Sequence, residues 1–168
     1  MAIALRDARR GDELAVAEVH VRSWREAYRE LMPAEFLAGL DPRDRAERYE
    51  FEAGEGKPTT VVATSGEAVL GFVTFGPSRD QDAEGLGEVY ALYVDPDRHE
   101  GGLGRMLMAE ARRRLVDAGF EAAVLWVLQG NERAASFYER DGWRPDGATR
   151  VEQPYGIVSS VRRFRRAL

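Results

Sequence analysis

The chain has 168 residues, of which 44% are hydrophobic and 32% are charged, the balance of one soluble globular domain with a core of ordinary size. It contains no cysteine, so a disulfide framework, a thiolate zinc site and a catalytic thiol are excluded. The formal net charge of −5 argues against a general nucleic-acid binder, because neutralising phosphates requires a basic face, and it slightly favours a cationic partner.

The N-terminal residues and the two histidines indicate where the protein is located and whether it binds a metal. Charged residues follow the first five apolar residues and no long apolar run occurs later, so we expect no signal peptide, no membrane span and a cytoplasmic location. The two histidines, His20 and His99, are far apart in the sequence. We interpret both as ordinary solvated or capping residues and expect no metal site.

The first third of the chain predicts one strand followed by helices. The strand covers residues 3–8, and Asp12 is a candidate cap for an amphipathic helix whose apolar positions continue to Leu31. Pro33 stands where a second, shorter helix would begin. Residues 41–56 are typical of a further, mostly polar helix that ends in a glycine-rich loop.

The remaining residues change to a strand-like period and then alternate. Residues 59–64 and 68–75 predict a hairpin turning at Ser65-Gly66, followed by an exposed loop at 76–87 and a strand at 88–94. A helix is expected at 103–118 with Gly119 as its C-terminal cap, then a buried strand at 122–128. A short helix capped by Asn131 and one last strand in the tail complete the chain.

This order of elements predicts an α/β fold, α+β in some schemes, with a mixed sheet. The strands at 88–94 and 122–128 flank a helix and so form a βαβ unit, which makes them parallel. No linker or repeat interrupts the pattern, and we expect a single domain over residues 1–168.

The stretch "RHEGGLGRML" at 98–107 places glycines between a strand and the start of a helix. Backbone N–H groups converge at such a turn and the helix dipole adds positive potential, so the turn favours a phosphate or pyrophosphate, although a tight turn without a ligand would also use glycine. The sequence lacks the Gly-Lys-Ser/Thr of a P-loop, and "GGLGRM" has the wrong spacing for a dinucleotide fingerprint.

The segment "LYVDPDRHEGGLGRMLMAEARRRL" resembles the acetyl-CoA-binding segment of the GNAT N-acetyltransferase superfamily, in which a strand leads to Q/R-x-x-G-x-G/A and a helix. Gly102 and Gly104 match the two required glycines. His99 stands where the family prefers Gln or Arg, with Arg98 beside it.

A second segment, "NERAASFYERDGW", resembles the family's N-x-x-A-x-x-F/L-Y-x-x-x-G-F pattern. The opening residues also resemble the first strand and helices of many members, so the likeness covers nearly the whole chain. The marked positions of the second pattern are Asn131, Ala134, Phe137, Tyr138 and Gly142, with Trp143 as the final aromatic residue.

The resemblance implies a mostly antiparallel sheet whose central parallel pair splays around a cofactor, with helices on both faces. It implies direct, acetyl-CoA-dependent acetylation of a primary amine of a small molecule or peptide, without a metal. The alternative is a non-catalytic module that binds or senses acetyl-CoA. Neither nucleic acid nor membrane is an expected partner, and a homodimer is left open.

By the same resemblance, Tyr138 protonates the leaving thiolate. Glu88, at the start of the central strand, is either a base or a solvated strand-end carboxylate. The backbones of residues 92–94 would hold the pantetheine arm. The expected cofactor-binding residues are Leu92, Tyr93, Val94, His99, Glu100, Gly101, Gly102, Leu103, Gly104, Arg105, Asn131 and Ser136.

Acceptor recognition is expected from the first two helices, the 76–87 loop and the last hairpin. Trp24, Tyr28 and Phe36 are candidates there, with packing in the core as the alternative for each.

Overall fold

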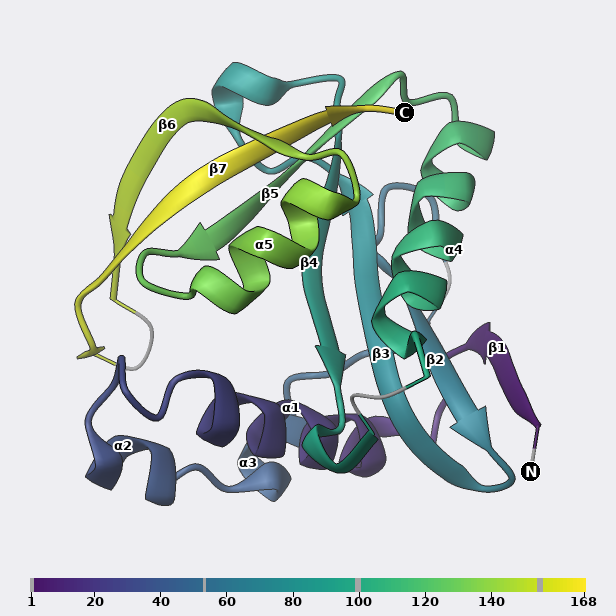
Figure 1. The fold of residues 1–168 in the computed structure, drawn as a ribbon. Coiled ribbons are helices and arrows are strands. Elements are labelled where there is room, and N and C mark those ends of the chain that lie inside the picture. The colour runs from purple at the N-terminus through teal and green to yellow at the C-terminus, as the bar shows by residue number, and fades with distance from the viewer. Residues whose placement is uncertain (1, 53, 99–100, 154–155) are drawn as a thin grey trace.

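The computed structural model describes residues 2–52, 54–98, 101–153 and 156–168 (Figure 1). Expectations for His99 and Glu100 therefore lie outside the described residues. The strands are β1 (Ile3–Asp7), β2 (Thr59–Ser65), β3 (Ala68–Pro77), β4 (Gly87–Val94), β5 (Ala122–Leu128), β6 (Arg144–Glu152) and β7 (Ser159–Ala167). The helices are α1 (Glu13–Ala27), α2 (Ala34–Ala38), α3 (Pro42–Ala46), α4 (Leu103–Asp117) and α5 (Glu132–Arg140), with short 3₁₀ turns η1 (Gln81–Ala83) and η2 (Pro96–Arg98).

The seven strands form one sheet in the order β1-β2-β3-β4-β5-β7-β6. Every neighbouring pair is antiparallel except β4 and β5, which run parallel. The predicted α/β fold, with its mixed sheet and central parallel pair, is confirmed.

The parallel pair separates soon after it forms. Strands β4 and β5 pair only at Gly87 with Ala123 and at Glu88 with Val124, although both strands continue well beyond these positions. Next to this point Tyr90 has no partner in the register of β3, which is a β-bulge that bends β4. The two strands consequently diverge, as Figure 1 shows, and leave a gap in the middle of the sheet.

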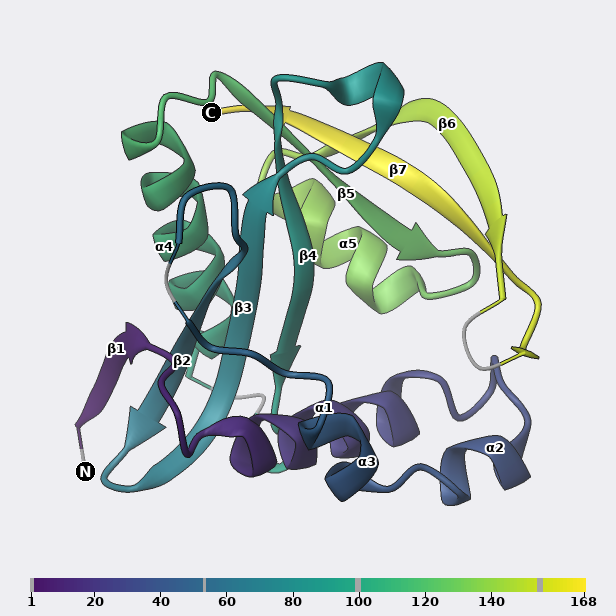
Figure 2. The same cartoon turned by 180° about the vertical axis from the view of Figure 1, so that it is seen from behind.

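Helices cover both faces of the sheet (Figures 1 and 2). On one face, α4 and α5 pack on a core cluster that includes Leu107, Leu125 and Phe164. On the other, Val16 and Val19 of α1 pack on Phe72 and neighbouring strand residues. In the described part of the chain, no helix has the length and apolar character needed to cross a membrane.

The structure also corrects parts of the sequence prediction. Strand β6 was missed, because it forms the outer edge of the sheet and has no apolar alternation: seven of its nine residues are exposed and none is buried. The third helix is limited to five residues. Asp12 does stand at the N-cap of α1, but its carboxylate accepts from Arg9 N–H at 2.8 Å and pairs with Arg6 instead of capping the helix.

Candidate active site

A cleft of about 470 Å³ lies where β4 and β5 diverge. Its walls are the diverging parts of both strands, the end of α1, the first turn of α4 and one side of α5. The lining residues are Ser23, Glu26, Ala27, Tyr28, Val89, Tyr90, Ala91, Leu92, Tyr93, Val94, Gly102, Gly104, Arg105, Leu125, Trp126, Val127, Leu128, Asn131, Arg133, Ala134, Phe137 and Tyr138.

The alternation of side chains along β5 divides the cleft into two sides. Leu125 and Val127 belong to the core cluster on which α4 and α5 pack. Trp126 and Leu128 therefore point to the opposite face of the sheet, where α1 lies. We call these the α4 side and the α1 side of the cleft.

The glycine-rich turn opens α4 on the α4 side. Gly101 and Gly102 both have positive φ, 93° and 74°, and a Cβ on either would meet nothing within 4 Å. Gly102 is the N-cap of α4 and its missing side chain leaves the first-turn N–H groups without a side-chain cap. Arg105 in that turn and Arg133 on α5 also line the cleft, so this end can hold an anion.

Gly104 has a different local role. A Cβ there would lie 3.3 Å from the Phe137 ring, a tighter contact than side chains normally make. The absence of a side chain therefore lets α5 pack closely against the beginning of α4. The two sequence motifs meet at this contact, although more than thirty positions separate them.

The backbone of β4 presents hydrogen-bonding groups to the gap. The N–H of Asp95 donates to Leu70 on β3, and alternation then directs the main-chain groups of Tyr93 to β3 and those of Leu92 and Val94 towards the gap. The Val94 carbonyl accepts from the Ser23 hydroxyl at 2.9 Å. Leu92 thus offers both a donor and an acceptor to an extended ligand lying between the strands.

Tyr138 stands on α5 with its ring packed edge-on against Phe137, at a centroid distance of 5.4 Å. Burial raises the pKa of its phenol well above the usual range, and the nearby Tyr93 raises it further. Tyr138 is therefore protonated at neutral pH and can donate a hydrogen bond into the cleft.

Asn131 combines a structural and a cleft position. Its side-chain oxygen accepts from Ala134 N–H at 3.2 Å, which is the N-cap that the sequence predicts, and the residue also lines the cleft. Leu103 is instead part of the core, and Ser136 is exposed, with its carbonyl accepting from Arg140.

Glu88 does not line the cleft. Its side chain is only 2% exposed, so the solvated carboxylate, one of the two alternatives that the sequence left open, is wrong. One oxygen accepts from Arg79 N–H at 3.0 Å and the other from the Arg79 guanidinium at 2.6 Å. This geometry favours a tether between β4 and the loop after β3 over an acid–base role.

His20 is also buried, which contradicts the solvated or capping position expected for it. Its Nδ1 lies 2.6 Å from the Tyr49 hydroxyl and its ring stacks on Tyr93 at 4.7 Å. Burial lowers the pKa of His20 to about 3, with a further contribution from Arg45. His20 is thus a neutral packing residue behind the wall of the cleft.

The structure brings together most of the site residues expected from the sequence. The ones in the cleft are Leu92, Tyr93, Val94, Gly102, Gly104, Arg105, Asn131 and Tyr138, with Gly101 exposed beside them. Of the acceptor candidates, Tyr28 lines the cleft, whereas Trp24 and Phe36 line a separate pocket of about 310 Å³ among α1, α2 and α3.

Sequence reasoning missed Ser23, Glu26, Arg133 and Trp126. Trp126 could have been noticed, because it is the one aromatic residue in the apolar strand at 122–128 and side chains alternate between the two faces of a strand. The other three are polar positions on helices, where nothing in the pattern distinguishes them from solvated residues.

A model of the acetyltransferase (GNAT) family matches residues 21–143. YuaI of Bacillus subtilis, an uncharacterised N-acetyltransferase, is 32% identical over 129 residues, which cover 77% of this chain and 73% of YuaI. The chain belongs to the GNAT family of acetyltransferases.

Another relative matches a smaller part of the chain, and a solved structure shows the fold alone. A mycothiol acetyltransferase of Geodermatophilus obscurus is 36% identical over 84 residues, 49% of this chain but 27% of that protein. The PaiA N-acetyltransferase of Thermoplasma acidophilum, solved in complex with coenzyme A, has a TM-score of 0.73 over 100% of both chains at 18% identity. As a GNAT protein the chain is an acyltransferase, which its two motifs predict.

Proposed function

We propose that this GNAT protein transfers the acetyl group of acetyl-CoA directly to a primary amine of a small molecule or peptide, in the cleft between β4 and β5. The observation that carries the proposal is the gap itself. An exposed strand edge, an open helix N-terminus and a protonated tyrosine all border one cleft.

The residues on the α4 side fit the coenzyme. Gly101 and Gly102 leave the amides at the start of α4 open to a pyrophosphate, and Arg105 adds positive charge in the same turn. Arg133 adds a second positive charge to the lining from α5. An extended pantetheine arm fits along β4, where Leu92 directs its backbone N–H and C=O into the gap. Asn131, the N-cap of α5, adds a side-chain amide to the lining of the cleft.

Acetyl-CoA supplies the acetyl group as a thioester, whose C–S bond is exchanged for a C–N bond to the amine. A backbone N–H of β4 can polarise the carbonyl oxygen, since this donor is fixed before charge develops. Tyr138 holds the proton that the sulfur requires. The proton of the attacking amine passes to water in the open cleft, because Glu88 is bound to Arg79 on both oxygens.

The test is a panel of primary amines incubated with the protein and acetyl-CoA, with release of the CoA thiol as the readout. The chain has no thiol of its own, so the background is low. We expect release that depends on at least one amine and on the protein. A protein that binds acetyl-CoA but releases no thiol with any amine would instead be a binding or sensing module.

A further inference from the structure

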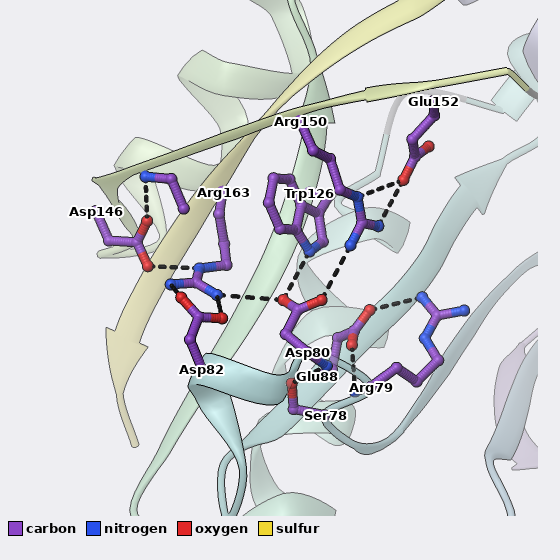
Figure 3. Close-up of polar contacts among 11 residues, drawn as sticks. Ser78, Arg79, Asp80, Asp82, Glu88, Trp126, Asp146, Arg150, Glu152 and Arg163 are labelled. Carbon is purple, nitrogen blue, oxygen red and sulfur yellow. Dashed lines mark hydrogen bonds and ion pairs between the residues drawn. The ribbon is translucent and has the colours of Figure 1, made fainter.

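The α1 side of the cleft contains a tryptophan that is held in place by an ionic cluster. Trp126 lines the cleft from β5, and its indole N–H donates to Asp80 Oδ2 at 2.9 Å (Figure 3). The Arg150 guanidinium lies over the ring at 4.0 Å. Neither Asp80 nor Arg150 lines the cleft, so these contacts leave part of the indole facing it.

Asp80 is the centre of this cluster. Its side chain is 8% exposed, and besides Trp126 it accepts from Arg150 at 2.9 Å and Arg163 at 3.3 Å. It thereby joins the loop before η1 to β5, β6 and β7. A buried carboxylate with three donors has little freedom, so the indole that it binds is fixed as well.

The guanidinium groups around Trp126 are already bound to carboxylates. Arg150 pairs with Asp80 and Glu152, and Arg163 pairs with Asp80, Asp82 and Asp146. Arg79 pairs with Glu88 nearby, as Figure 3 shows. These eight side chains comprise five carboxylates and three guanidiniums. This cluster therefore has more carboxylates than guanidiniums, and all three of its guanidiniums are already paired. The two arginines that line the cleft, Arg105 and Arg133, belong to helices α4 and α5 on its other side.

The same side of the cleft has a second aromatic wall. Tyr28, at the end of α1, lines it, and Glu26 from the same helix adds another carboxylate to the lining. Burial raises the pKa of Tyr28 to about 12, so its hydroxyl stays neutral. Two aromatic surfaces with acidic surroundings match a protonated amine that carries a flat apolar group.

We propose that Trp126, positioned by Asp80, binds the body of the acceptor, and that the acceptor is an arylalkylamine without a carboxylate. This inference rests on the proposed acetyl transfer and specifies its substrate class. It accounts for Asp80 as a positioning residue, because Asp80 touches the indole and the network but not the cleft.

The first experiment compares three amines with the wild-type protein: phenylethylamine, propylamine and phenylalanine. The readouts are kcat/KM from thiol release and saturable quenching of tryptophan fluorescence by the amine. We expect phenylethylamine to give a kcat/KM roughly tenfold or more above the other two, since ring stacking and the missing carboxylate both favour it. Equal or better use of propylamine or phenylalanine would overturn the proposal.

Variants then locate the effect. Trp126→Leu should raise the KM for phenylethylamine roughly tenfold, with kcat little changed and propylamine unaffected, and should abolish the fluorescence quenching. Trp126→Phe, which keeps a ring, should recover part of the preference. Asp80→Ala should raise the same KM by freeing the indole. Asp82→Asn is the control for the ionic cluster. Asp82 binds Arg163, whose guanidinium lies 5.7 Å from the centre of the Trp126 ring, but unlike Asp80 it accepts no hydrogen bond from the indole.

Failure of this inference is distinguishable from failure of acetyl transfer. If acetyl-CoA does not bind, the proposed function fails. If acetyl-CoA binds and arylalkylamines are not acetylated, or if Trp126→Leu leaves the amine preference unchanged, the substrate class is wrong. A loss of preference in Asp82→Asn equal to that in Asp80→Ala would refute the positioning role of Asp80.

Discussion

Tyr138 is the residue on which the proposed chemistry depends most. Burial in the cleft raises its pKa, so the phenol keeps its proton over a wider range of pH than an exposed tyrosine, whose pKa is about 10. An acid must be protonated to act, and a raised pKa therefore shifts the loss of activity to higher pH.

We expect Tyr138→Phe to lower kcat by about 100-fold or more while the affinity for acetyl-CoA stays within about twofold. The kcat of the wild type should not decline through tyrosine ionisation below about pH 10. Steady-state kinetics at several pH values and acetyl-CoA titration measure these quantities. Equal kcat in the two proteins would remove Tyr138 from the mechanism.

For Glu88 we expect a small effect on kcat, in contrast to Tyr138. Because Arg79 binds both of its oxygens, Glu88→Gln should cost about 1 kcal/mol of stability and lower kcat by less than about threefold. Denaturant unfolding and kinetics together check it. A 100-fold fall in kcat with unchanged stability would show that Glu88 is the base after all.

His20 predicts a pH dependence of stability. Its pKa in the folded protein, about 3, lies below the unfolded value of about 6.5. The contribution of neutral His20 to stability is therefore complete above pH 6.5 and is lost as the pH falls towards 3. Between pH 6.5 and 4.5, the free energy of unfolding of the wild type, measured in urea, should fall by up to about 1.4 kcal/mol per pH unit more than that of His20→Gln. Parallel curves would mean that His20 is accessible to protons in the folded protein.

At the scale of elements, the two ends of α4 provide a matched pair of glycines. Gly102 and Gly119 both have positive φ, and a Cβ on either would meet open space. Alanine at either position should therefore cost a similar free energy of unfolding, about 1–2 kcal/mol. Only Gly102→Ala should also weaken acetyl-CoA binding, measured by calorimetry, because only that end faces the cleft. Equal affinities would contradict the pyrophosphate assignment.

The elements that could be predicted from sequence are those with strong local signals. The strand at 122–128 is a continuous apolar run, and the helix after Gly102 has one apolar face and a glycine just before and just after it. Both were placed within one residue. Strand β6 could not be found, because it pairs only with β7 and carries mostly exposed residues. The helix α3 was predicted but made too long, since a polar segment contains no apolar period that fixes its end.

At the scale of the whole molecule, the site results from two strands that begin as partners and then separate. The sequence indicated the parallel pair and both motifs, and the family resemblance implied the separation. The bulge at Tyr90, the contact between Gly104 and Phe137, and the ionic cluster around Asp80 depend on residues that are distant in sequence. Local patterns carry no information on such contacts.

Occupation of this gap by acetyl-CoA is the condition for everything proposed above, and it can be measured as a shift in melting temperature. With acetyl-CoA at a hundred times its Kd, mass action should stabilise the folded protein by about 2.7 kcal/mol, which corresponds to a rise of roughly 5–11 °C for a chain of this length. A rise that grows with concentration and is reduced in Gly102→Ala but not in Gly119→Ala is the predicted result. A melting temperature that acetyl-CoA leaves unchanged at millimolar concentration would contradict it.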